Sequence, residues 1–148
     1  RGPDMAALAE ACWEEHGVDV FVVDALRVEG PGGVPRSVPG VAASIPVAAG
    51  TRSRAAPVVV EGSWTQEDAE AHTLLGVRMA HELGHALGLF HPREADAPDG
   101  TYVVDNLEDT PEDPSVLPGW LMHRAPTRVS TRTSDGQRAR VTRSPVLR

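Results

Sequence analysis

The sequence contains 148 residues, a length that fits one domain able to bury a hydrophobic core. Its formal net charge of −7 at pH 7 argues against a nucleic-acid-binding protein, because phosphate contacts require clustered positive charge. No stretch approaches the roughly 18 consecutive apolar residues of a membrane span, so we expect a globular domain with no nucleic-acid partner and no membrane span.

The first part of the chain combines helical and extended patterns. Residues 4–16 are predicted to form an amphipathic helix, because their apolar positions share one helical face. The β-branched run at 18–28 predicts a strand. Residues 29–57 are rich in Gly, Pro, Ser and Ala and predict a loop with one edge strand at 41–47. Residues 57–60 are predicted to form another strand.

Cys12 is the only cysteine, so no internal disulfide can form. Its place in a helical pattern predicts a small buried core residue. The chain begins at Arg1 rather than at a methionine, and we expect a mature form or an excised domain.

The longest helical pattern covers residues 66–87 and contains no proline. Thr65 is its predicted cap, with Asp68 three residues later as an acidic variant of the capping box. Beyond residue 91 repeated prolines and acidic residues predict irregular structure, and a final helix is expected from about 133 or 134 to 143.

Three of the six histidines lie in one short stretch, HELGHALGLFH, at residues 81–91. On a helix, His81 and His85 project from the same face one turn apart. Glu82 lies one step around the helix, where its carboxylate can reach a water on a cation shared by the imidazoles. Gly88 lets the chain leave the helix and turn back, so that His91 can become a third ligand.

Three imidazoles suit a catalytic zinc site with water as the fourth ligand. Zinc would lower the pKa of that water toward about 7, and Glu82 could accept its proton during amide hydrolysis. The spacing thus predicts one Zn²⁺ held by His81, His85 and His91, with Glu82 as general base. A packing role for the histidines is the weaker interpretation, because these five positions rarely coincide by chance. A structural zinc site is also weaker, since such sites use four ligands and favour Cys.

The stretch fits HExxHxxGxxH and resembles the signature of the metzincin metalloendopeptidases. The resemblance implies a methionine turn, for which Gly119-Trp120-Leu121-Met122 is the candidate, with Met122 beneath the metal. Asp109-Thr110-Pro111 and the stretch TSDGQRARV at 133–141 are similar to the pappalysin-type branch and related bacterial members.

This resemblance implies an α+β, metzincin-like fold in one catalytic domain, residues 1–148. The N-terminal subdomain, about 1–91, would contain a mixed twisted sheet and two helices, including the zinc-binding active-site helix. The C-terminal subdomain, about 92–148, would be smaller and irregular, with the Met-turn and the final helix.

Two features depart from the family pattern around Met122. Pappalysin-type enzymes usually carry cysteines near this turn, and this chain has none there. Many metzincins place a Tyr two residues after the Met, where it helps to stabilise the oxyanion, and this chain has Arg124. Either His123 or Arg124 takes over that role, or both are ordinary surface residues.

An acidic cluster follows the zinc motif and includes Asp105, Glu108 and Asp109. Related enzymes bind calcium in this region, and carboxylate oxygens suit Ca²⁺. A solvated acidic loop is the simpler interpretation.

The predicted function is a zinc-dependent endopeptidase that cleaves a protein or peptide substrate. The substrate would lie extended and pair with the edge strand at 41–47. The alternatives are a catalytically silent zinc-bearing binding or adhesion module, which the intact Glu82 argues against, and a zinc hydrolase of small amides, which would have a closed pocket. By resemblance we expect a secreted or cell-surface bacterial protein that is a monomer.

Overall fold

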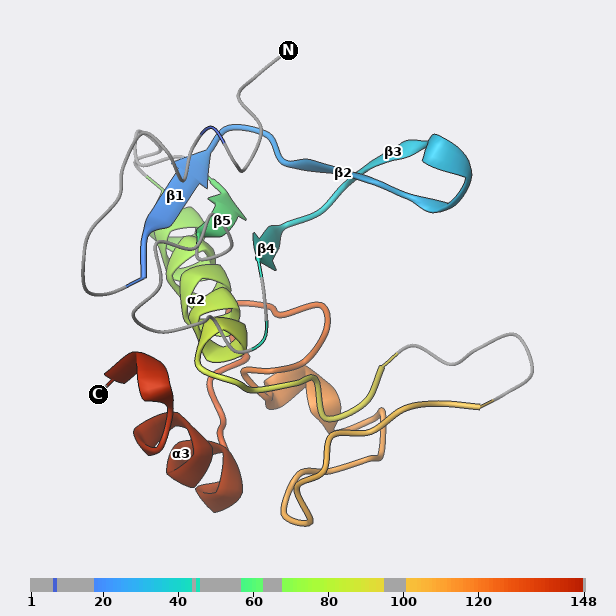
Figure 1. Ribbon diagram of the computed structural model, residues 1–148, viewed down its shortest axis with the longest axis vertical. Helices are drawn as coiled ribbons and strands as arrows, with labels where there is room; N and C mark the ends of the chain where they lie inside the picture. The colour runs from blue at the N-terminus through green and yellow to red at the C-terminus, as the bar shows by residue number, and fades with distance from the viewer. Residues whose placement is uncertain are drawn as a thin grey trace.

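The computed structural model describes residue 7 and residues 18–43, 45, 57–62, 68–94 and 101–147. These residues form an α+β structure, which confirms the predicted fold class (Figure 1). The strands are β1 (Val20–Val23), β2 (Arg27–Glu29), β3 (Pro35–Ser37), β4 (Gly40–Ala42) and β5 (Val58–Glu61). The helices are α2 (Ala69–Ala86) and α3 (Asp135–Thr142), with 3₁₀ turns η1 (Pro31–Gly33), η2 (Leu117–Gly119) and η3 (Pro145–Leu147).

Within the described residues, the main sheet has three strands in the order β1-β5-β4. β1 and β5 are parallel, with Val20 opposite Val58, whereas β4 runs antiparallel to β5, with Val41 opposite Val59. β4 is therefore an edge strand, and its outer backbone groups face away from the sheet. β2 and β3 pair separately as an antiparallel hairpin that extends away from the sheet (Figure 1).

Two strand predictions need correction. The run predicted as one strand at 18–28 is divided into β1 and β2, because a bend at Asp24 interrupts it. The edge strand predicted at 41–47 is found as β4 at Gly40–Ala42, and residues 44, 46 and 47 lie outside the described part of the chain. The predicted strand at 57–60 corresponds to β5.

The hydrophobic core lies between the sheet and α2. Val58 and Val60 of β5 are fully buried and pack with Leu75 and Ala86 of α2. β5 is the central strand and is covered on both faces, which explains its unbroken run of valines. Burial of each such side chain contributes about 1.5–3 kcal/mol.

Helix α2 begins later than the sequence pattern predicted. Its N-cap is Asp68, whose side chain accepts a hydrogen bond from the Glu70 backbone N–H at 2.9 Å. Thr65, the predicted cap, lies outside the described residues, as does the predicted helix at 4–16 except for Ala7, which is helical. Cys12 lies in the same undescribed segment.

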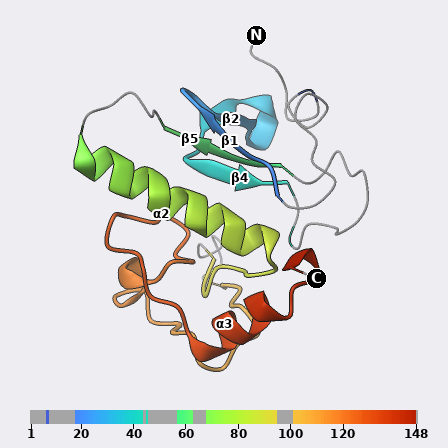
Figure 2. The same cartoon turned by 90° about the vertical axis from the view of Figure 1, so that its left-hand side faces the viewer.

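The C-terminal segment covers the side of α2 that faces away from the sheet (Figure 2). Its final helix, α3, has the full capping box: Ser134 Oγ accepts from the Gln137 N–H, and the Gln137 side chain accepts from the Ser134 N–H. Val146 in η3 packs against the core beside β5 and α2. Within the described part of the chain, no helix is long and apolar enough to cross a membrane.

Candidate metal centre

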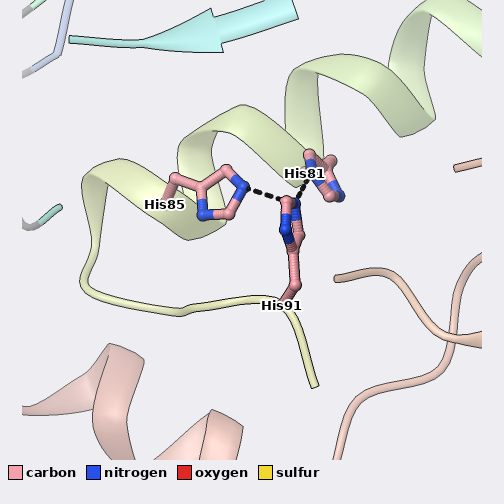
Figure 3. A group of neighbouring side chains, drawn as sticks. All are labelled: His81, His85 and His91. Carbon is pink, nitrogen blue, oxygen red and sulfur yellow. Dashed lines mark hydrogen bonds between the residues drawn. The ribbon is translucent and has the colours of Figure 1, made fainter. Parts of the chain in front are cut away.

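The structure brings the three motif histidines together (Figure 3). His81 and His85 project from the last two turns of α2, and His91 approaches them from the segment that follows the helix. The Nε2 atom of His91 lies 3.1 Å from Nε2 of His85 and 3.3 Å from Nε2 of His81. Among the described residues, these three side chains are the one group of three or more His, Cys, Asp or Glu residues that could hold a metal ion.

The turn after α2 places His91. Gly88 adopts the left-handed conformation, with φ at 101°, which a side chain would disfavour. The Leu89 N–H donates to the Gly84 carbonyl and the Gly88 N–H donates to the His85 carbonyl, both at 2.9 Å. This is a Schellman ending, and it reverses the chain as the position of Gly88 in the sequence predicted.

Each imidazole is held through its Nδ1 atom. The three acceptors are the Leu121 carbonyl for His81 (2.7 Å), the Leu89 carbonyl for His85 (2.8 Å) and the Glu94 carboxylate for His91 (2.7 Å). Carbonyl and carboxylate oxygens accept, so the proton of each neutral ring lies on Nδ1. The three Nε2 lone pairs therefore point at one another, an arrangement that fits a shared cation and matches the usual support of metal-binding histidines.

Burial keeps these rings neutral. It lowers the pKa of His81 to about 4 and the pKa of His91 to about 4, and it lowers the pKa of His85 as well. The neutral imidazole is the form that binds a metal. The donor set therefore fits a zinc ion without first losing protons at neutral pH.

Glu82 lies beneath strand β4. Its side chain is buried, with 6% exposure, and a Cβ atom added to Gly40 would lie 2.5 Å from Glu82 Oε1. Burial raises the pKa of the Glu82 carboxyl to about 7, against the opposing effect of a hydrogen bond from the Ala42 backbone. The carboxylate is thus enclosed between the active-site helix and the edge strand.

Met122 is completely buried against the helix that carries the histidines. A Cβ atom added to Gly84 would lie 2.5 Å from Met122 Sδ. Gly84 lies between His81 and His85 along α2, so the thioether packs directly on the helix backbone of the site. This contact explains a glycine inside a helix, where it costs about 1 kcal/mol relative to alanine.

The histidines and Glu82 line a cleft of about 390 Å³. β4 contributes Gly40, Val41 and Ala42 to it, and Arg36 and Arg124 line it as well. A larger hollow of about 640 Å³ lies near Arg140 of α3, but none of the histidines lines it.

The two residues that follow Met122, the methionine of the predicted Met-turn, lie in different places. Arg124 lines the cleft. His123 is not among the residues that line it, and its Nδ1 atom lies 3.0 Å from the Ala125 carbonyl oxygen. The sequence did not reveal three supporting contacts of the site: Glu94 at His91, the Leu121 carbonyl at His81, and β4 over Glu82. Only the Glu94 contact is local enough to be predicted from spacing, because Glu94 lies three residues after His91.

The acidic cluster gives the calcium interpretation no support. Asp105 accepts from the Thr110 hydroxyl at 2.6 Å and from the Leu107 N–H at 3.2 Å. Asp109 accepts from Ser134 Oγ at 2.8 Å and from the Gly136 N–H at 2.7 Å. The two carboxylates thus accept hydrogen bonds from different parts of the C-terminal segment. Glu108 is exposed. In the described residues they form no shared ligand group.

Comparison with known proteins agrees with this arrangement. The peptidase M43 family model, described as pregnancy-associated plasma protein-A, matches residues 4–123, which include the three histidines, Glu82 and Met122. Searches of curated proteins and of solved structures gave no match. With most of its length matched by this model, the chain belongs to the pregnancy-associated plasma protein-A family of metzincin zinc metalloendopeptidases.

Proposed function

We propose that His81, His85 and His91 ligate one catalytic Zn²⁺ and that Glu82 is the general base for peptide-bond hydrolysis. The observation that carries this proposal is the convergence of three Nε2 lone pairs, each ring being fixed by an acceptor at Nδ1. Zinc held there would lower the pKa of a ligated water and polarise the scissile carbonyl.

The position of Glu82 supports its role in proton transfer. Its carboxylate is buried beside the first zinc ligand and opens onto the same cleft as the histidines. There Glu82 would take a proton from the attacking water and deliver it to the leaving nitrogen. A raised pKa, near 7, suits a group that both accepts and returns a proton close to neutral pH. A silent binding module would have no use for this enclosed carboxylate.

The edge strand supports a polypeptide substrate. β4 borders the cleft with Gly40, Val41 and Ala42, and its outer backbone groups face away from β5. An extended peptide could pair with these groups and pass its scissile bond over the histidines. This arrangement favours an endopeptidase over a hydrolase of small amides, which would not need a strand along the site.

The experiment is a digest of a denatured protein mixture, with new termini mapped by mass spectrometry. Wild-type protein should produce internal cleavages that a chelator abolishes and added Zn²⁺ restores. Glu82→Gln should keep about one zinc per chain while its kcat falls by roughly 10²-fold or more. Cleavage that persists in the chelator, or at the wild-type rate in Glu82→Gln, contradicts the proposal.

A further inference from the structure

Two arginines line the cleft and have no partner among the described residues. Arg36 comes from β3 of the hairpin, and Arg124 comes from the segment after Met122. No hydrogen bond or ion pair joins either guanidinium to a residue in the described ranges. In contrast, Arg128 pairs with Glu70, and Arg140 donates to Asn106 at 2.7 Å.

The acidic side chains of the cleft are already engaged. Glu82 is enclosed beneath β4, and Glu94 accepts a hydrogen bond from His91 Nδ1. Because the His91 ring is neutral, Glu94 keeps its negative charge; apart from the enclosed Glu82, the other charged groups in the described lining of the cleft are the two guanidinium groups, which outnumber it. Their positive charge is opposite in sign to the net charge of the whole chain, which is −7.

We propose that this cleft selects peptides carrying an Asp or Glu side chain near the scissile bond, with Arg36 and Arg124 as the residues that determine this specificity. The inference rests on the proposed peptidase function. A guanidinium group binds a carboxylate through two parallel hydrogen bonds, which gives both attraction and orientation. The two arginines lie on different elements, so each meets a different part of an extended substrate.

The test compares paired peptides that differ only by Glu or Gln at single positions on either side of the scissile bond. The wild-type enzyme should show a kcat/KM for its best Glu peptide at least about threefold above the Gln partner, the scale of a partly exposed ion pair. This ratio should fall as salt is added, because exposed charges are screened.

Charge reversal tests each arginine. In Arg36→Glu and in Arg124→Glu the Glu-to-Gln ratio of kcat/KM should fall to one or below at the position that the arginine contacts. Arg27→Glu is the matched control, because it makes the same charge change at an exposed residue of the neighbouring strand β2, outside the cleft. Its ratio should equal that of the wild type. Zinc content and circular dichroism verify that each variant is folded.

The outcomes separate the two proposals. Chelator-sensitive cleavage with equal kcat/KM for Glu and Gln peptides overturns the inference and leaves the peptidase function intact. A uniform loss of kcat on all peptides in Arg124→Glu, with the ratio unchanged, overturns its specificity role and points to stabilisation of the transition state. If Arg27→Glu changes the Glu-to-Gln ratio of kcat/KM by the same amount, the inference is overturned, because a long-range electrostatic effect then explains the ratio. Absence of chelator-sensitive cleavage of any peptide overturns both.

Discussion

Met122 Sδ and the backbone of Gly84 are in direct contact, so close that an added Cβ atom at Gly84 would lie 2.5 Å from the sulfur. The contact joins the predicted Met-turn to the part of α2 between two candidate zinc ligands. A change at Gly84 or at Met122 is therefore expected to disturb the geometry of the site, although neither residue is a candidate ligand.

Gly84→Ala should lower the free energy of unfolding by about 1–3 kcal/mol, the usual effect of overpacking a filled core. The control is Gly76→Ala in the same helix, where an added Cβ meets nothing within 4 Å and the residue is exposed. That variant should be stabilised by up to about 1 kcal/mol through helix propensity. Denaturant unfolding measures both, and equal stabilisation of the two would refute the close contact.

Met122 is expected to act by packing and not as a metal ligand, because a thioether is a soft and weak partner for zinc. Met122→Leu conserves volume and should cost less than about 1.5 kcal/mol of stability with zinc retained. Met122→Ala should cost about 2–5 kcal/mol, since the side chain is fully buried. Thermal unfolding beside zinc analysis distinguishes them; zinc loss from a folded Leu variant would indicate ligation by sulfur.

Gly40→Ala should reduce activity without removing zinc. The new methyl group would lie 2.5 Å from Glu82 Oε1, so the carboxylate would have to move while the histidines remain in place. We expect kcat to fall by about tenfold or more, within the range that proton transfer contributes, and the melting temperature to change little. An unchanged kcat would show that the position of Glu82 under β4 does not matter for catalysis.

Asp109 should give the C-terminal segment a pH-dependent stability. Hydrogen bonds from the Gly136 N–H and from Ser134 hold the pKa of this carboxyl below 3.8, its ordinary value. A depressed pKa means that the stabilisation is present above the unfolded pKa and is lost as the pH falls through the folded pKa. Asp109→Asn should therefore destabilise the protein at pH 7, and its difference from the wild type should shrink as the pH falls below about 4.

The control for this prediction is Glu108→Gln, which removes the same charge at the preceding, exposed residue. Its unfolding free energy should follow that of the wild type across the same pH range. A constant difference between Asp109→Asn and the wild type at all pH values would show that ionisation of Asp109 contributes nothing.

The sequence predicted the site residues that lie close together along the chain, but it did not predict most of the contacts that hold their side chains in place. Candidate ligands four residues apart on a helix, followed by a glycine that ends the helix, are encoded within one short stretch, and the structure brings all three histidines together. The Leu121 carbonyl and the Gly40 backbone reach the site through tertiary packing, across 40 residues in the case of His81. The hydrophobic periodicity of the sequence cannot predict such contacts.

The fold was likewise predicted only where the sequence pattern is strong. A buried central strand such as β5 and a long helix such as α2 have strong patterns, and both were predicted, although α2 begins at Ala69 rather than near 66. The hairpin of β2 and β3 was not expected as such, because each strand has only three residues and β3, Pro-Arg-Ser, is exposed throughout and contains no apolar and polar alternation. Gly- and Pro-rich composition there resembled a loop.

The hydrogen bond from His81 to the Leu121 carbonyl has a thermodynamic consequence. The acceptor that fixes this imidazole is supplied by the C-terminal half of the chain, next to the buried Met122. Metal affinity and the folding of that half are therefore coupled, and by reciprocity each raises the equilibrium constant of the other by the same factor. A chain cut off after His91 would keep all three candidate ligands but would lose part of their affinity for a metal.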